Sequence, residues 1–470
     1  MRKIYWYLTS YVRKYGLLLL LTLFGGILIF SIAVPTLLSK IEKQNTIYIG
    51  IIGQFTLDRL PDSIANQLSV GLTQVNADDT ISPVLAERWT VEQEGTNYRF
   101  VLKDGLAWHD GTPFTTENIQ FYLPNVETII TPRDIVFKLP ASYAPFPSIV
   151  ATPLFKKSEL NHWFLFHKPT VVGIGTNFSI VDYDRKNTSN YLSDLVVESR
   201  SERYVYRFYL TEQDAITAFQ RGEIDQVQDL AKTWPIMKWD SVATTASLHP
   251  DQYSAVFFNH RNSLFTKNIR QALAYATTKA APERRAISPI NGLSWAYYAG
   301  SKSYDTDVER AIERLLEELP REKLSFSLTT TTLFEDQAAI IQSEWQNLGS
   351  LAVERCNQSS QIQDKSLCAN LGIEVQLKIA NFPDTSNFDT ILIGQEAPPD
   401  PDQYELWHSN EPTNFSGYKN TRIDNILEKG RQTNSRDERI QLYQEFQQFL
   451  TEDAAAIFLE HLTSYRIERL

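Results

Sequence analysis

Residues 85–121 constrain the fold of this chain more than any other stretch, and they read LAERWTVEQEGTNYRFVLKDGLAWHDGTPFTTENIQF. Large apolar residues occupy every second position from Tyr98 to Leu102, which predicts a strand with one buried face. Three glycines each follow an acidic residue, and glycine tolerates the positive φ that a tight turn needs. The stretch therefore predicts short strands joined by tight turns, packed as one unit by the large side chains of Trp89, Trp108 and Phe114.

The same stretch resembles the signature of the bacterial extracellular solute-binding proteins of the peptide/nickel class, family 5. The shared order is LA-x-x-W, a spacer, Y-x-F-x-L-x-x-G and then W-H-D-G-x-P-F-T, which here begins at Leu85 and ends at Thr115. Two further segments resemble the family: residues 256–279, VFFNHRNSLFTKNIRQALAYATTK, and residues 400–424, which begin DPDQYELWHSN. Together the three segments spread the resemblance over most of the chain.

The resemblance implies an α/β protein with a two-lobed, periplasmic-binding-protein-like type II fold. In that fold, hinged α/β lobes with mixed sheets hold a ligand in the cleft between them. We expect lobe I to comprise residues 45–255 and 457–470, and lobe II residues 256–456. Within lobe II, helical periodicity predicts a helix over 334–348 that ends at Gly349, and 456–459 reads as a short strand that returns to lobe I.

An uncharged segment of 23 residues, Gly16 to Leu38, precedes the folded lobes. At about 1.5 Å per residue it can cross a hydrocarbon core of roughly 30 Å. Basic residues precede it, so the positive-inside rule predicts a cytoplasmic N-terminus (1–15), a transmembrane anchor (16–38) and lobes outside the cytoplasm. The alternative is a cleavable signal peptide with a cleavage site near Ala33.

The net charge and the motifs of the chain exclude several classes of function. A formal net charge of −11 argues against nucleic acid as a partner, because phosphate binding needs a basic surface. No nucleophile elbow, zinc-protease motif or P-loop occurs, and adjacent His109 and Asp110 read as a turn rather than as an acid/base pair. We therefore predict no enzyme activity, metal or cofactor. We expect the two cysteines, Cys356 and Cys368, to form a disulfide, and two free thiols are the alternative.

The family resemblance also points to ligand-binding residues. Peptide-binding relatives anchor the peptide's α-amino group with an Asp three residues before a D-P or E-P pair, and the matching position here is Ala397, next to Glu396. Either Glu396 binds from a shifted register, or the ligand is not an ordinary peptide. The candidate ligand-binding residues are Glu396, Gln395, Asp400, Trp295 and Tyr253. A turn role for Asp400 and a core role for Trp295 are the structural alternatives.

The predicted function follows from the resemblance. The chain is expected to be a single-pass cell-membrane protein with a periplasmic or extracellular binding domain, and a monomer. It would capture peptides or a related small solute, such as a metal chelate, for the permease and ATPase of an ABC importer. The alternative is a membrane-tethered sensor, or a chaperone-like peptide binder, that has no transporter.

Overall fold

The computed structural model describes residues 14–16, 22, 24, 26, 30, 45–115, 121, 123–131, 133–161, 167–186 and 189–470. Within these residues, no helix combines the length and the apolar character that crossing a membrane requires. The predicted anchor, residues 16–38, lies outside the described residues except at a few single positions.

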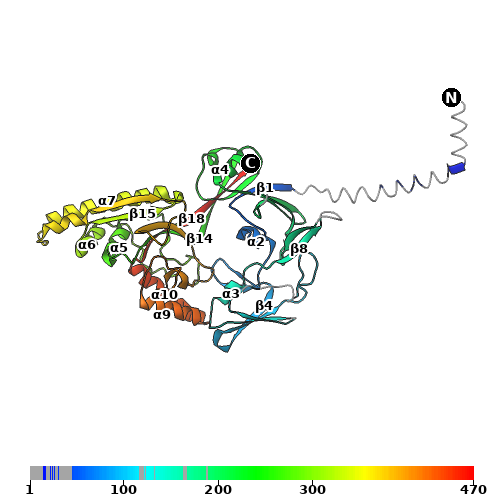
Figure 1. Ribbon diagram of the computed structural model, residues 1–470, viewed down its shortest axis with the longest axis horizontal. Coiled ribbons are helices and arrows are strands. Elements are labelled where there is room, and N and C mark those ends of the chain that lie inside the picture. The colour runs from blue at the N-terminus through cyan, green and yellow to red at the C-terminus, as the bar shows by residue number, and fades with distance from the viewer. Residues whose placement is uncertain are drawn as a thin grey trace, which may run out of the picture.

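Two long strands, β14 (Val242–Phe258) and β18 (Ala456–Arg469), run through the middle of a ten-stranded sheet. They pair antiparallel from one end to the other, and the pairing shifts register between His249 and Tyr253. Beyond this shift β14 also pairs with β17 (Thr390–Glu396), whereas the far end of β18 pairs with β13 (Gln226–Leu230). Figure 1 shows the two strands where the two halves of the molecule meet. The predicted lobe boundaries at 255/256 and 456/457 fall within this crossing and stay a prediction.

Lobe I contributes a mixed half of the large sheet. Its strands follow the order β10-β11-β12-β1-β13, in which β1 is parallel to β12 and β13. The helices of this half include α2 (Asp62–Leu68) and α4 (Glu212–Gln220). The other strands of this half are β1 (Asn45–Ile52), β10 (Ser179–Arg185), β11 (Leu192–Glu198) and β12 (Glu202–Tyr209).

Residues 86–102 contribute two strands to a separate antiparallel sheet, ordered β4-β5-β7-β6. The predicted pair of strands is confirmed, with Trp89 opposite Phe100. Phe100, Phe137 and Phe146 pack with ring centroids 5.0 to 6.4 Å apart and form the core beneath. The elements here are β4 (Ala86–Glu92), β5 (Asn97–Leu102), β6 (Glu127–Ile130), β7 (Asp134–Lys138), α3 (Phe146–Ile149), and the hairpins β2 (Thr73–Val75)/β3 (Ile81–Pro83) and β8 (Lys156–Asn161)/β9 (His167–Val172).

Lobe II sandwiches the other half of the large sheet between two layers of helices. Alternate residues of a strand point to opposite faces. Accordingly Val256 and Phe258 join the core beneath α5–α7, whereas Phe257 joins the core beneath α9 and α10. The elements are α5 (Lys267–Ala276), α6 (Val308–Glu318), β15 (Leu324–Thr330), α7 (Glu335–Gln358), β16 (Ile373–Ile379), α8 (Tyr404–Trp407), α9 (Thr421–Gln432) and α10 (Arg436–Glu452).

Two expectations about element length are wrong. Helix α7 does not end at Gly349 but continues to Gln358. Gly349 lies against β16, and a Cβ atom there would collide with the backbone of Ile373, so this glycine permits close packing and does not end the helix. The predicted short strand at 456–459 is the beginning of the 14-residue β18, which also pairs in lobe I.

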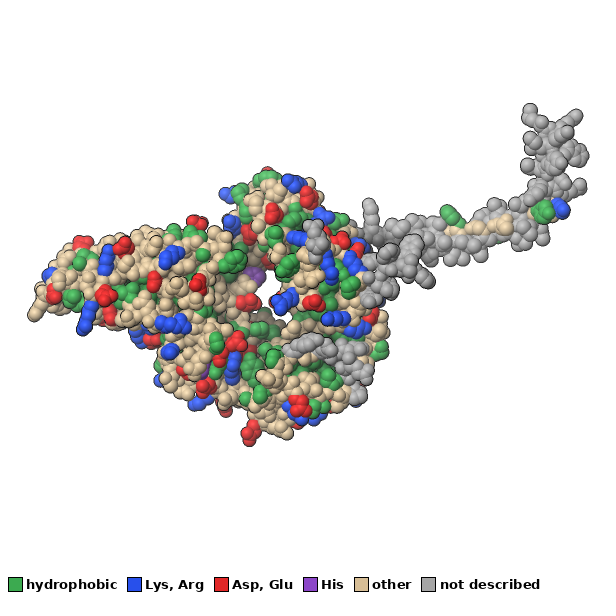
Figure 2. All heavy atoms as spheres, viewed as in Figure 1, with side chains coloured by type: hydrophobic (Ala, Val, Ile, Leu, Met, Phe, Trp, Pro, Cys, Tyr) green, Lys and Arg blue, Asp and Glu red, His purple; other side chains and the backbone are tan. Residues whose placement is uncertain are grey.

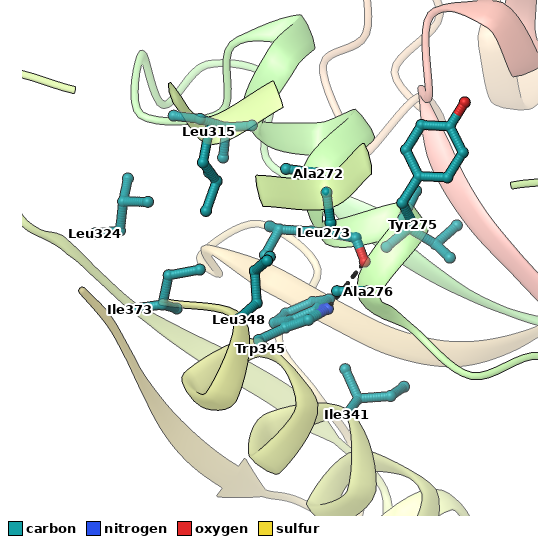
Figure 3. Close-up of a cluster of buried hydrophobic side chains, with 14 of the residues drawn as sticks. Ala272, Leu273, Tyr275, Ala276, Leu315, Leu324, Ile341, Trp345, Leu348 and Ile373 are labelled. Carbon is teal, nitrogen blue, oxygen red and sulfur yellow. Dashed lines mark hydrogen bonds between the residues drawn. The ribbon is translucent and has the colours of Figure 1, made fainter. Parts of the chain in front are cut away.

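The core beneath α5–α7 is centred on Trp345 (Figure 3). Its side chain is fully buried, and its indole N–H donates to the carbonyl of Leu273 at 3.2 Å and to Thr277 Oγ1 at 3.0 Å. Further along α7, Cys356 forms a disulfide with Cys368, with their Cα atoms 5.6 Å apart. These contacts fix α7 to α5 and to the segment that leads into β16.

Replacing Trp345 with alanine should lower the free energy of unfolding by about 3–5 kcal/mol, because it leaves a large cavity and removes both hydrogen bonds of the indole N–H. Urea denaturation followed by circular dichroism measures this loss. The control is Trp239→Ala: Trp239 is 52% exposed, and its loss should cost at most about 0.5 kcal/mol. Equal losses in the two variants would contradict the assignment of the core.

Candidate functional site

A cavity of about 620 Å³ lies between the lobes, and Figure 2 shows the surface hollowed where they face each other. Lobe I lines it with the loop before α3 and with α3 itself, including Tyr143 and Ile149. Lobe II lines it with the end of β17, the loop after it, and Arg431 of α9. Because both lobes form its walls, a change in the angle between them would open or close the cavity.

Gln395 and Glu396, the last two residues of β17, both line this cavity. Glu396 pairs with Gln252 of β14, so it lies at the crossing between the lobes. Partial burial raises the pKa of its carboxyl, and the nearby carboxylates of Asp251 and Asp62 raise it further. Asp62 begins α2 in lobe I, so carboxylates from both lobes and from the crossing strand affect one another here. A cationic group of a ligand would relieve this repulsion.

Asp400 also lines the cavity, but a buried ion pair with Arg439 of α10 neutralises its charge. Its carboxylate further accepts the backbone N–H of Asp402 at 3.1 Å. Asp402 in turn pairs with Arg431 of α9 at 2.6 Å. The D-P-D segment thus fastens the cavity wall to two helices, which matches the turn alternative for Asp400.

Trp295 lies at a direct contact between the lobes. Its backbone N–H donates to the carbonyl of Asp78, and its indole N–H to the carbonyl of Asp79, both at 3.0 Å. The ring borders a smaller cavity of about 260 Å³, which shares Asp400 and Pro145 with the larger one. Trp295 therefore has an interlobe position, and the guanidinium of Arg439 lies 5.2 Å from its ring.

Further hydrogen bonds join the lobes along the same rim. Together with those of Trp295 we call them the closing contacts: Ala144 N–H to the Arg431 carbonyl at 2.6 Å, Ser142 Oγ to the Gln432 carbonyl at 2.9 Å, and Tyr98 Oη to Asn434 Oδ1 at 3.2 Å. Sequence reasoning missed these contacts. Most of them use backbone carbonyls, which any residue carries, so no residue pattern indicates them.

Asp79 lies buried within the closing contacts. Burial raises the pKa of its carboxyl to about 6, and the negative charges of Asp400 and Asp251 act in the same direction. Hydrogen bonds from Ser294 and Asn291, both in lobe II, oppose the shift. The ionised form of Asp79 is therefore disfavoured while these contacts between the lobes are made.

Tyr253, unlike the other candidate residues, lies in the hydrophobic core. It is 2% exposed and packs on Phe458 of β18 with ring centroids 5.5 Å apart, in the core beneath α9 and α10. It lines neither interlobe cavity. The structure thus brings Gln395, Glu396 and Asp400 together around the larger cavity, places Trp295 beside the smaller one, and leaves Tyr253 in the core.

No group of three or more His, Cys, Asp or Glu side chains in the described part of the chain is arranged to hold a metal ion. What the cavity presents instead is carboxylate, amide and aromatic groups, which suit reversible binding of an organic molecule.

The chain is similar to proteins of known binding function. It is 21% identical over 504 residues to the oligopeptide-binding protein AppA of Bacillus subtilis (strain 168), covering 89% of this chain and 87% of AppA. Among solved structures, NikZ from Campylobacter jejuni in complex with Ni(L-His) matches with a TM-score of 0.67 and 21% identity, covering 91% of this chain and 94% of NikZ. AppA from Bacillus subtilis in complex with a nonapeptide matches with a TM-score of 0.62 and 19% identity, covering 90% and 94%. These structures confirm the two-lobed α/β fold with mixed sheets.

The model of the bacterial extracellular solute-binding proteins, family 5 Middle, matches residues 80–134 and 128–417. These ranges cover most of both lobes, including the opening stretch, the crossing strand β14 and the cavity wall after β17. The chain therefore belongs to family 5 of the bacterial extracellular solute-binding proteins.

Proposed function

We propose that this protein is the solute-binding subunit of an ABC importer and captures a peptide or a related small solute in the interlobe cavity. The observation that carries the proposal is the cavity of about 620 Å³ with walls from both lobes. Ligand pockets in proteins have volumes of roughly 300–1,000 Å³. Closure of two hinged lobes around a ligand is a common route to capture, and the closed form would be the one delivered to a permease.

We infer that Glu396 binds a cationic group of the solute. Ala397, in the position where peptide-binding relatives carry an Asp, is buried and uncharged. Glu396 is exposed, lines the cavity, and is repelled by Asp251 and Asp62. A charge-assisted hydrogen bond to an ammonium or guanidinium group would offset that repulsion, and it would strengthen as the cavity closes and excludes water.

We further propose that residues 16–38 tether the lobes to the membrane and that residues 1–15 stay in the cytoplasm. The support is the sequence: an uncharged run of 23 residues preceded by basic ones. A tether would keep the lobes close to the permease and would raise their effective concentration there. The permease and ATPase subunits are therefore proposed partners of a monomeric binding protein.

Native mass spectrometry of the full chain in detergent tests the proposed capture. We expect the purified protein to carry a solute that is released on denaturation and bears a cationic group, because the cavity offers an unneutralised carboxylate. Short peptides of mixed sequence would support peptide capture, and one non-peptide compound would support a changed ligand. An empty protein that no peptide library stabilises would refute solute capture and favour a receptor role.

Glu396→Gln should weaken binding of the released solute at least about tenfold, because the amide keeps the size of the side chain but removes its charge. Isothermal titration calorimetry measures the change. The matched control is Glu374→Gln on β16, whose carboxylate pairs with Lys323 at 2.7 Å on the exposed surface away from the cavity. Unchanged affinity in the Glu396 variant would exclude the proposed contact.

Lobe closure should depend on pH through Asp79. The closed form raises the pKa of its carboxyl from 3.8 to about 6, so the closed form binds a proton more tightly than an open form in which Asp79 is solvated. Closure should therefore become more favourable as the pH falls from 7.5 through 6 towards 4, and the gain should be lost as the pH rises again. The charged groups that face this contact are Asp400, Asp251 and Arg439, together with Arg436 beside Asp78.

Small-angle X-ray scattering of the solute-free protein measures this dependence. The radius of gyration of the wild type should decrease between pH 7.5 and pH 5, whereas Asp79→Asn should be as compact at pH 7.5 as the wild type is at pH 5. Asp104→Asn, on an exposed turn of lobe I, should behave as the wild type does. A variant Asp79→Asn that still follows the wild-type pH profile would show that another group controls closure.

A further inference from the structure

A third cavity, of about 180 Å³, lies wholly within lobe I. Its walls come from the end of α2, the turn after β5 that contains His109, the hairpin β8/β9 and the beginning of β10. Its lining residues differ from those of the two interlobe cavities. A cavity needs a volume of only roughly 10–15 Å³ to hold one water molecule. This cavity therefore has room for a small organic molecule.

The W-H-D-G motif places His109 at this cavity. The turn is closed by the backbone N–H of Trp108, which donates to the carbonyl of Thr112 at 2.9 Å, and the backbone N–H of His109 donates to the carbonyl of Gly173 at 3.1 Å. Gly173 cannot be replaced by a larger residue, because a Cβ atom there would collide with the carbonyl of Leu68. The backbone around His109 is therefore fixed, and its ring borders the cavity.

The carboxylate of Asp110, next to His109 in the chain, is already paired with Lys156. Burial opposes ionisation of Asp110, but hydrogen bonds from Lys156 and Thr112 outweigh it and lower the pKa of the carboxyl to about 2. Lys156 Nζ lies 2.6 Å from this carboxylate and 5.8 Å from the ring of Trp108. Burial also lowers the pKa of His109, so its ring is neutral at physiological pH and offers one donor and one acceptor.

Buried polar atoms at the cavity lack partners within the described part of the chain. Both ring nitrogens of His109 and the hydroxyl of Thr170 are buried without a hydrogen bond to any described group, and Thr170 is only 4% exposed. A weak backbone hydrogen bond with Thr176 partly opposes the lowering of the His109 pKa, and its geometry is poor for either ring nitrogen. Buried polar groups in folded proteins are almost always satisfied, so these atoms are available to hydrogen-bond a small molecule or water in the cavity.

The walls define the chemistry of that molecule. Hydroxyl groups of Ser158, Thr170 and Ser179 accompany the neutral imidazole, and Ser158 lies directly opposite Thr170 in the hairpin. Leu68, Phe155 and Ile180 supply apolar surface. We propose that this cavity binds a small uncharged molecule with hydroxyl groups on an aliphatic skeleton, at a site independent of the interlobe solute.

Histidine NMR of the full chain in detergent tests this site with 1,2-propanediol as the probe. The chain has seven histidines, so ¹³Cε1 labelling gives few signals, and His109→Gln identifies the signal of His109. We expect 1,2-propanediol to shift that signal saturably and to leave the signal of His249, which hydrogen-bonds to Ser464 on the crossing strands, unchanged.

Thr170→Val distinguishes a binding site from a structural cavity, because valine keeps the shape and removes only the hydroxyl. It should weaken binding of 1,2-propanediol about tenfold, the loss of one hydrogen bond. Ser350→Ala, which removes an exposed hydroxyl on α7, is the matched control and should leave the affinity unchanged. Either a His109 signal that does not respond to the probe, or equal affinity in Thr170→Val and the wild type, would overturn the proposal and leave a cavity that holds water only.

Discussion

The antiparallel pairing of β14 with β18 is the contact on which the rest of the structure depends. Thirteen residue pairs, from Val242 opposite Arg469 to Phe257 opposite Ala456, carry the backbone from one lobe into the other. Neither lobe can separate from its partner without breaking this ladder of hydrogen bonds. Any relative motion is therefore confined to where the ladder is interrupted, and the register shift between His249 and Tyr253 is such a place, because a bulge bends and twists a strand locally.

The opposite rim is held by a different kind of contact. Hydrogen bonds from Trp295, Ala144, Ser142 and Tyr98 join the lobes there, and each contributes little net free energy because water replaces it when it breaks. Strong pairing at the hinge and weak contacts at the rim allow closure without unfolding. Such a balance lets a solute in the cavity decide which state is populated.

Sequence reasoning predicted the family, the two-lobed α/β fold and the strands of the opening stretch, since turn glycines, alternating aromatic residues and ordered motifs are local signals. It proposed Gln395, Glu396 and Asp400 as cleft residues from their positions at or just before the D-P pair, and all three line the larger cavity. It misplaced the end of α7, because Gly349 reads locally as a helix end but permits contact with Ile373. It could not foresee the buried place of Tyr253, the length of β18 or the closing contacts, since strand register and backbone pairing come from tertiary packing.

The most direct test of this account is the distance between the lobes measured by double electron–electron resonance in the full chain. Spin labels at Lys378 of β16 and Glu92 of β4 would report on the two lobes, and both positions are exposed. We expect a broad, longer distance distribution in refolded protein freed of solute, and a single shorter distance after the released solute is added back. An identical distribution with and without solute would contradict a binding protein that closes around its ligand.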